Sequence, residues 1–424
     1  GNFFLFDLFG PDGNVNEHLF AYSNRLGDER ALVLYNNRYE SAEGWIRFSA
    51  AHLADGELRQ TMLADALALP DDHDAYVVFR DHSSGLEFIR NCQLLRHQGL
   101  AVHVEGYRYN VFLDFRIVRP SRLKPYDRIC HELDGRGTGS IDLEALSMSL
   151  RPVHRIIAAA LAAEAVPAQA KTPDDRIDAA AFGQQCEQLL LDVATQFEQI
   201  MERPLDLPPG IARSASERYL GAMRIYTCLG KLPGEKRLKA ALGVGHDGGR
   251  SFRRTISELL ALECIQEMVS HNGLLQQQLI DDWLLGSALE PAWQQESGLP
   301  FSGREQVDLF SCLLLPKRAA EIPDTLAGLL KAQLAGLFES GDPHFFSFMQ
   351  FQHIHGRSWF REHRFMLMLS WLWLHAQIRE QAAPDGGKGP AGDTAMKGWL
   401  EALEQLDAAA FLSGYEMLAL LKGA

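Results

Sequence analysis

The sequence predicts an α+β fold in which an antiparallel, β-rich N-terminal domain precedes an all-α helical domain. Up to residue 118, short runs of aromatic and β-branched residues alternate with turn clusters, which is typical of strands. From Pro120 onward, apolar residues recur at helical spacing instead. We therefore expect a β-sandwich-like domain with helical insertions in residues 1–118, a helical domain in residues 119–383, a flexible linker in residues 384–393 and a C-terminal helix in residues 394–424.

Turn residues separate the strand signals of the first region. The run FFLFDLF at residues 3–9 ends in the turn cluster GPDG, and apolar side chains stand at every second position of residues 109–115. Further strands are expected at residues 31–35, 44–49, 75–80 and 100–105. Two helical insertions are expected among them, at residues 57–69 and 85–98.

The second region carries helical periodicity almost throughout. The expected helices are residues 126–133, 142–150, 153–163, 175–201, 212–229, 251–270, 274–295, 306–315, 322–339, 357–383 and 394–422. Residues 165–174 read as a linker. Residues 384–393, with the sequence PDGGKGPAGD, consist almost entirely of turn formers and read as a mobile linker.

Composition excludes several classes of protein. The chain has 424 residues, with 41 basic and 55 acidic side chains, so its net charge is −14. An acidic chain without basic clusters does not suit nucleic acid or an anionic membrane as a main partner. The six cysteines form no CxxC pair and no zinc spacing, which favours a reducing, cytoplasmic location. No apolar run approaches the roughly 18 residues of a membrane span.

The first residues suggest a piece of a larger protein. The chain opens with Gly1 rather than Met and enters a strand-like run at once. No charged segment followed by an apolar one marks a signal peptide. We therefore expect further sequence upstream.

A glycine-rich stretch at residues 133–145, LDGRGTGSIDLEA, resembles a calcium-binding EF-hand loop. Asp134, Gly139 and Asp142 stand at loop positions one, six and nine. Arg136, however, occupies a position where calcium requires an oxygen ligand. We interpret the stretch as a turn between two helices and expect no metal there.

Residues 243–248, GVGHDG, match the GxGxxG pattern of dinucleotide-binding folds. That site requires a strand directly before the glycines, so that the pyrophosphate meets a helix N-terminus. Here the preceding residues 235–242 are helical, so a loop between helices is expected and no cofactor is assigned.

Four histidines, His344, His353, His355 and His363, lie within twenty residues, with Glu362 close by. Imidazole and carboxylate are metal ligands. The same stretch is dense in Phe, Met and Trp, which is typical of helix core. We expect histidines with structural or surface roles and no metal site.

Asp12, Asn14 and Asn16 form an oxygen-rich segment between two expected strands. One interpretation of the segment is a cation-binding site. Asp and Asn also tolerate turn dihedrals, so a hairpin turn explains the segment.

Arg80, Asp81 and His82 follow an expected strand. An Asp and a His side by side suggest general acid–base chemistry, with Ser83 and Ser84 adjacent. The alternative is a polar strand-to-helix turn in which a serine caps the helix. No catalytic residue is assigned.

Four aromatic residues of the β-rich region, Tyr35, Trp45, Tyr107 and Tyr109, could stack on sugar rings. Core packing is the other use of such side chains. The sequence leaves both readings open, so substrate-binding residues remain unknown at this stage.

Several segments together resemble a known family. They are residues 2–38, 78–82 (VFRDH), 85–90 (GLEFIR), 111–116 (VFLDFR) and 151–155 (RPVHR). These are similar to the region that follows the catalytic barrel in large α-amylase-like proteins of glycoside hydrolase family 13. The resemblance covers about the first 155 residues and none of the family's diagnostic motifs.

The resemblance implies a role without catalysis in this chain. In that family a catalytic Asp, a Glu acid/base and a second Asp act on the glycosidic bond at the rim of a barrel. None of these motifs is present, so no catalytic residue, metal or cofactor carries over. The expected function is a C-terminal region that buttresses an upstream catalytic barrel and holds α-glucan. The alternative is a helical interaction or dimerisation scaffold without a glycan role.

Overall fold

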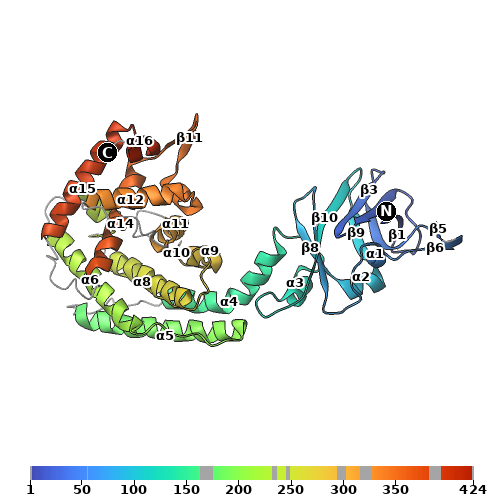
Figure 1. Ribbon diagram of the computed structural model, residues 1–424, viewed down its shortest axis with the longest axis horizontal. Helices are drawn as coiled ribbons and strands as arrows, with labels where there is room; N and C mark the ends of the chain where they lie inside the picture. The colour runs from blue at the N-terminus through green and yellow to red at the C-terminus, as the bar shows by residue number, and fades with distance from the viewer. Residues whose placement is uncertain are drawn as a thin grey trace. The chain divides into compact units, whose positions relative to one another are not determined.

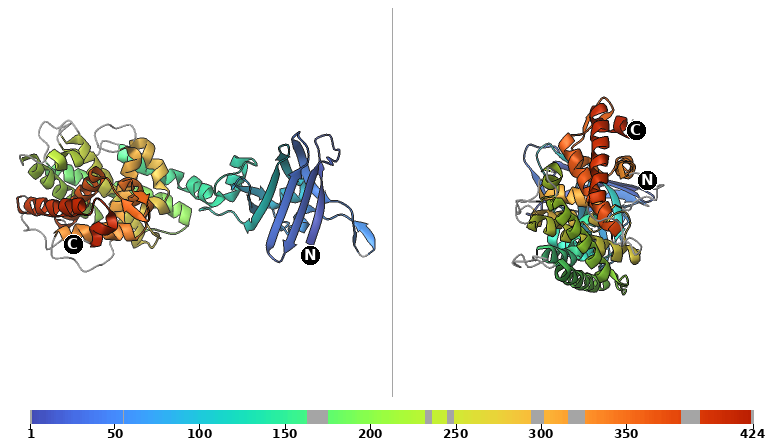
Figure 2. Two further views of the ribbon diagram at one scale, coloured as in Figure 1. Left: turned by 90° about the horizontal axis from the view of Figure 1, so that it is seen from above. Right: turned by 90° about the vertical axis from the view of Figure 1, so that its left-hand side faces the viewer.

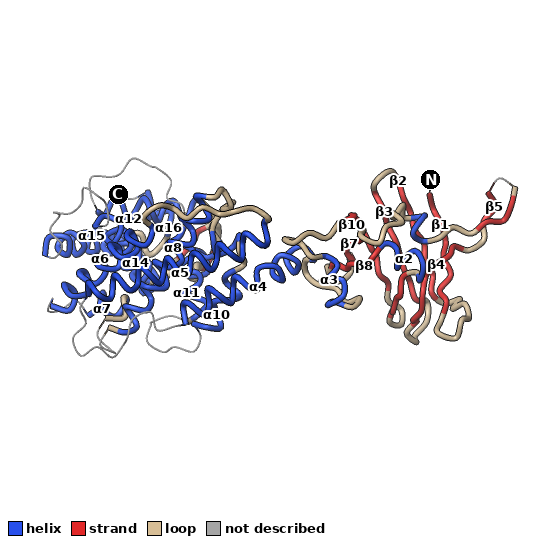
Figure 3. Tube along the Cα trace, turned by 90° about the horizontal axis from the view of Figure 1, so that it is seen from below, coloured by secondary structure: helices blue, strands red, loops and turns tan. Residues whose placement is uncertain are grey.

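The computed structural model describes residues 2–54, 56–162, 175–231, 236–244, 249–293, 302–315, 326–381 and 393–422. The chain divides into two compact units, unit 1 (Gly1–Arg151) and unit 2 (Pro152–Ala424). Strands predominate in unit 1 and helices in unit 2 (Figures 1 and 3). The mixed α+β class predicted from the sequence is confirmed.

The main strands of unit 1 form one eight-stranded antiparallel sheet in the order β8-β7-β10-β3-β2-β1-β4-β9 (Figure 2). Its strands are β1 (Asn2–Phe9), β2 (Leu19–Leu26), β3 (Glu29–Asn36), β4 (Ala42–Ser49), β7 (Tyr76–Asp81), β8 (Glu87–Asn91), β9 (Leu100–Val104) and β10 (Tyr109–Val118). A separate ribbon joins β5 (His52–Ala54) to β6 (Glu57–Arg59). A single, strongly curled sheet therefore takes the place of the two facing sheets of a sandwich.

The inner face of the sheet carries the main core. Side chains of a strand alternate between faces, so Leu32 and Leu34 point inward with Ile46 and Val77. Two short helices, α1 (Leu63–Ala66) and α2 (Cys92–Gln98), contribute side chains to the same cluster. Because these apolar groups leave water together, they supply the main stabilisation of unit 1.

The outer face is covered only in part. Near β7 and β8, helix α3 (Tyr126–Leu133) and the first turns of α4 (Ile141–Ala162) form a second cluster. In that cluster Val78 and Ile89 meet Tyr126 and Ile129. β7 is therefore buried on both faces, whereas the strands from β10 to β1 keep an outer face of their own.

Both predicted helical insertions of unit 1 are wrong in part. Residues 57–69 contain β6 and only the four-residue α1, and residues 85–98 begin with β8 before α2. Glu87 favours helix locally, but its ion pairs with distant arginines hold it in a strand. β2 was not predicted, because its first four residues, LFAY, are all apolar and its next three, SNR, are all polar, so polar and apolar residues do not alternate along it.

In its described residues, unit 2 is a packed set of helices with one short hairpin. The elements that follow α4 are α5 (Asp175–Met201), α6 (Ile211–Lys231), α7 (Lys236–Ala241), α8 (Arg250–His271), α9 (Leu279–Asp282), α10 (Leu285–Trp293), α11 (Gly303–Leu314), α12 (Leu326–Glu339), α13 (Pro343–Met349), β11 (Gln352–Ile354), β12 (Arg357–Trp359), α14 (Glu362–Gln381), α15 (Asp393–Leu412) and α16 (Met417–Lys422). The expectation that residues 357–383 contain a buried central helix is confirmed for α14, where Phe365, Trp371 and Trp373 are buried.

Several predicted helix boundaries in this region are wrong. Residues 142–150 and 153–163 belong to the single helix α4, which continues through Pro152. Burial of Leu150, Val153 and Ile157 on either side offsets the hydrogen bond that proline removes. Residues 394–422 form two helices, which Gly414 and Tyr415 separate with left-handed backbone. The linker expected at residues 165–174 and most of that at residues 384–393 lie outside the described residues. No helix of the described part could cross a lipid bilayer.

Candidate functional site

The most distinctive surface of unit 1 is an apolar patch on the outer face of β1, β2, β3 and β10. Its members are 36–56% exposed although all are large and apolar. We call this patch the aromatic face, and it consists of Phe3, Leu5, Phe20, Tyr22, Tyr35 and Tyr109. Contiguous apolar surface of this kind marks an interaction site in most proteins.

Strand register brings these side chains together. Leu5 lies opposite Tyr22, and Tyr35 lies between Phe20 on one side and Tyr109 on the other. Directly opposite residues in antiparallel strands have their Cβ atoms about 5 Å apart, so their side chains touch. Phe3 lies opposite Asn24, diagonally from Tyr22, and the Phe3 and Tyr22 rings also meet, with centroids 5.4 Å apart. The face is therefore one connected surface rather than scattered residues.

The four aromatic residues singled out in the sequence are exposed and do not form core. Tyr35 and Tyr109 belong to the aromatic face. Trp45 lies on β4 opposite Ala101, and Tyr107 lies in the turn before β10 with a positive φ of 55°. Core packing is therefore excluded for all four.

Sequence reasoning missed four of the six residues of the aromatic face. Phe3, Leu5, Phe20 and Tyr22 were not singled out, because β1 and β2 carry apolar residues on both faces. A strand with that pattern shows no polar side that would mark its outward face. The available signal was the surplus of apolar residues in the run LFAY at residues 19–22, beyond what one buried face uses.

The Asp81–His82 pair does not form a catalytic arrangement. The Asp81 carboxylate is buried and accepts hydrogen bonds from the hydroxyls of Ser83 and Ser84 at 2.8 Å and from the Asn110 amide at 3.1 Å. Burial acts to raise the pKa of Asp81, but these hydrogen bonds lower it below its usual value. His82, in contrast, is exposed. Asp81 therefore organises the turn from β7 to β8, and the predicted strand-to-helix turn is a strand-to-strand turn.

A buried carboxylate, Glu87, organises the covered part of the outer face. It accepts hydrogen bonds from Arg116 at 3.0 and 3.1 Å, from Arg80 at 2.9 Å and from the backbone N–H of Ile141 at 2.9 Å. Burial acts to raise the pKa of Glu87, but Arg116 and Ile141 lower it overall. The glutamate thus stays ionised and ties α4 to the sheet.

The loop that resembles a calcium site is a structural turn between α3 and α4, as interpreted from the sequence. Thr138 exchanges two backbone hydrogen bonds with Glu87, at 2.7 and 2.9 Å. Arg136 donates to the carbonyls of Leu133 and Glu132. Asp142, a potential ligand, accepts instead from Arg116 and Lys124, each at 3.1 Å. The side chains of Arg116 and Lys124 therefore bind the Asp142 carboxylate, which a calcium ion would need as a ligand.

The clustered histidines have separate partners in the structure. His344 contacts Asp308 at 2.7 Å and Asp281 at 2.9 Å, whereas the His353 ring contacts the Ser358 hydroxyl at 3.0 Å. Among the described residues, one group of three could hold a metal ion, namely Asp72, His73 and Asp74. Asp72 already pairs with Arg119 at 2.6 Å.

Of the two remaining motifs, one forms a turn in the structure and the other lies mostly outside the described residues. Asp12 accepts hydrogen bonds from the backbone and the side chain of Asn14, so the segment forms a turn. The GxGxxG stretch follows α7, and its residues 245–248 lie outside the described part of the chain.

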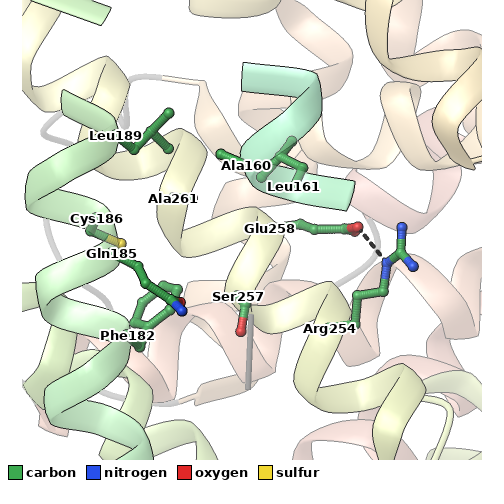
Figure 4. Close-up of a pocket in the computed structure, with 10 residues that line it drawn as sticks. All are labelled: Ala160, Leu161, Phe182, Gln185, Cys186, Leu189, Arg254, Ser257, Glu258 and Ala261. Carbon is green, nitrogen blue, oxygen red and sulfur yellow. Dashed lines mark hydrogen bonds and ion pairs between the residues drawn. The ribbon is translucent and has the colours of Figure 1, made fainter. Parts of the chain in front are cut away.

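Unit 2 contains a small pocket between the end of α4, α5 and α8 (Figure 4). Glu258 and Arg254 form an ion pair at its edge, at 2.8 Å, and Gln306 donates to the other Glu258 oxygen at 2.7 Å. The volume of about 40 Å³ could hold a few water molecules but no organic ligand. The remaining lining is Ala160, Leu161, Phe182, Gln185, Cys186, Leu189, Ser257 and Ala261.

Comparison with known proteins adds no relative: no family model, curated protein or solved structure matches the chain. The aromatic face is the candidate functional site on its geometry alone.

Proposed function

We propose that unit 1 is a non-catalytic module of an α-amylase-like, α-glucan-acting enzyme of the cytoplasm. Its aromatic face packs against the catalytic barrel of the same polypeptide and buttresses it. The observation that carries the proposal is the connected apolar face left open on β1, β2, β3 and β10. The family resemblance of residues 2–38 covers β1, β2 and β3, which form most of that face.

The chemistry of the face favours a protein partner over a sugar. Phe3, Leu5 and Phe20 offer no hydrogen-bonding group, whereas a glucan presents hydroxyls along its length. The three tyrosines retain hydroxyls at the margin of such an interface, where water satisfies them. A glucan held at the tyrosine side, near Tyr107 in the turn before β10, is the secondary role of the same surface.

The size of the face favours a tethered partner. Covering six half-exposed side chains yields on the order of 1 kcal/mol each. Free association costs about 4–15 kcal/mol in lost translational and rotational freedom, which consumes a gain of this size. A partner in the same chain has a high effective concentration and avoids most of that cost.

The direct test uses the polypeptide that includes the proposed barrel. We expect the double substitution of Phe20→Ser with Tyr22→Ser to lower the melting temperature of the barrel and its starch hydrolysis. Tyr39→Ser is the matched control, because Tyr39 is 82% exposed and lies in the turn before β4. Equal behaviour of the two variants would contradict the buttress.

The chain as given supplies two further readouts. We expect no hydrolysis of starch or glycogen by the purified chain, and robust hydrolysis would refute a non-catalytic module. Co-sedimentation with insoluble starch measures the secondary role. Retention that the Phe20→Ser and Tyr22→Ser pair abolishes would assign the face to glucan instead.

A scaffold function without glycan is the second candidate. It is favoured by exposed apolar side chains near the end of α15 and on α16, namely Phe411, Leu412 and Leu418. A stable dimer by light scattering that dissociates on Phe411→Ser, with no retention on starch, would support the scaffold over the enzyme module.

A further inference from the structure

Unit 2 contains a cleft of about 530 Å³ that the proposed function of unit 1 does not use. Its walls are α6, α8, the end of α11 and α14. This volume lies within the range of small-molecule sites, which is about 300–1,000 Å³. One wall is apolar and consists of Leu313, Leu314 and Leu315, whereas the others carry charged and polar side chains.

Ion pairs across three helices form the charged part of the cleft. Glu263 of α8 is 5% exposed and contacts Arg218 of α6 at 3.3 Å and Arg379 of α14 at 3.5 Å. The buried His375 ring also contacts this carboxylate through Nε2. Arg218 reaches Glu267 at 3.2 Å with its other terminal nitrogen. Burial acts to raise the pKa of Glu263, but His375, Arg379 and Arg218 lower it to about 2.

The paired charges argue against a charged ligand. Two arginines of the lining, Arg218 and Arg379, face two carboxylates, Glu263 and Glu267. These two positive and two negative charges balance, so the cleft gives neither an anion nor a cation a net electrostatic attraction. A charged ligand that displaced Arg218 from Glu263 would also leave a buried carboxylate without this partner, which is costly.

Some donors and acceptors of these charged side chains nevertheless make no hydrogen bond among the described residues. Among the described residues, the one polar contact of Arg379 is that of its Nε with Glu263, so its terminal nitrogens remain as donors. Glu267 uses one oxygen on Arg218. Gln266 donates from its amide nitrogen to the Leu314 carbonyl at 2.7 Å, and its Oε1 is buried, so this side chain adds no free group to the cleft. Donors and acceptors therefore lie in one cleft.

We propose that this cleft binds a neutral polyhydroxylated small molecule, such as a mono- or disaccharide. A hydroxyl both donates and accepts, so a set of them satisfies the Arg379 guanidinium and the Glu267 carboxylate without displacing any ion pair. Leu315, the partly exposed leucine of the lining, offers an apolar surface to the C–H face of a sugar ring. The site is separate from the aromatic face and does not depend on the function proposed for unit 1.

Calorimetric titration of the whole chain tests the site, with maltose, myo-inositol and inorganic phosphate as probes. We expect saturable binding of maltose or myo-inositol and none of phosphate. Arg379→Gln removes a charged donor while leaving Glu263 with Arg218 and His375. It should weaken the binding about tenfold, the usual effect of losing a charged hydrogen bond. Arg213→Gln is the matched control, because Arg213 is exposed on α6 and pairs only with Glu217 in the described structure.

Three outcomes would overturn the proposal. One is phosphate binding tighter than either neutral probe, and another is no saturable binding of maltose or myo-inositol to the folded chain. The third is binding that Arg379→Gln leaves intact but the Phe20→Ser and Tyr22→Ser pair removes, which would place the sugar on the aromatic face. If Arg379→Gln disturbs folding, Glu267→Gln serves as the second cleft variant. It changes an exposed side chain and should also weaken binding.

Discussion

Both units bury carboxylates, but among the described residues unit 2 buries more of them, whereas the aromatic face belongs to unit 1. Unit 1 leaves apolar side chains on its surface, as Phe20 and Tyr22 show. Unit 2 places charged side chains in its interior, where Glu258, Glu263 and Asp308 are almost fully buried. An uncovered apolar face gains free energy only when something covers it. Buried charges cost free energy unless partners hold them in place. The first unit is therefore suited to docking, and the second to a fixed internal geometry.

The largest expected effect on stability comes from removing a buried charge of unit 2. Glu263→Gln leaves Arg218, Arg379 and His375 without their shared carboxylate. It should lower the unfolding free energy by about 3 kcal/mol, measured by urea titration of the helical circular dichroism. Glu267→Gln, four residues later on α8 and largely exposed, should cost less than about 1 kcal/mol. Equal losses would show that the interior of unit 2 does not depend on this pair.

The next effect concerns pH. Burial acts to lower the pKa of His344, but Asp308 and Asp281 raise it to about 9. Below the ordinary histidine value near 6.5, the folded and unfolded chains are both protonated and the stabilisation is complete. As the pH rises toward 9, the unfolded chain gives up a proton that the folded chain keeps, so the unfolding free energy should fall by about 2 kcal/mol.

Urea titrations between pH 6 and 9.5 measure this slope. His344→Gln should remove most of it, because the substituted side chain does not titrate. His353→Gln is the matched control, since His353 lies in the exposed β11–β12 hairpin, and it should retain the slope. A slope that survives in His344→Gln would assign the pH dependence to another group.

An effect of similar size is expected at the charge network of unit 1. Glu87→Gln weakens hydrogen bonds from Arg116, Arg80 and Ile141 and should destabilise β7 and β8 by about 2 kcal/mol. Hydrogen exchange of peptides from these strands measures it. Asp114→Asn, at an exposed position 3.9 Å from Arg80, should change exchange by less than about 0.5 kcal/mol.

The smallest stability effect should come from the aromatic face itself. Tyr35→Ser is expected to change the unfolding free energy of unit 1 by less than about 1 kcal/mol, because its side chain already meets water. Leu34→Ala, the preceding residue on the opposite face, should cost about 2–5 kcal/mol. Urea titration, with hydrogen exchange of β3 as the readout, compares the two variants. A large cost at Tyr35 would mean that the face is structural.

Helices and strands that are determined by neighbouring residues could be predicted from the sequence. The α3 helix was predicted to the residue, because Pro125 precedes its first turn and Gly135 follows its end. The alternating run of residues 109–115 identified β10 in the same way. Elements that depend on contacts with residues far away in the sequence were missed. β8 is a strand because β7 and Thr138 pair with it, and neither is visible in the run GLEFIR.

The candidate sites show the same limit. Tyr35 and Tyr109 could be selected as aromatic residues near strand ends, but their meeting across β3 and β10 depends on strand order. The ion pair of Glu263 with His375 joins residues 112 positions apart, and that of Asp308 with His344 joins residues 36 apart. Sequence spacing carries no information on such encounters, which depend on helix packing.

The backbone pairing of Thr138 with Glu87 has a consequence for solubility. β8 is the last strand at its end of the sheet, so its outward N–H and C=O groups could recruit a strand from another molecule. The Gly-rich loop occupies that position at Glu87. Shortening the loop would bare this edge, and the altered chain should then assemble into β-rich aggregates although its core residues are untouched.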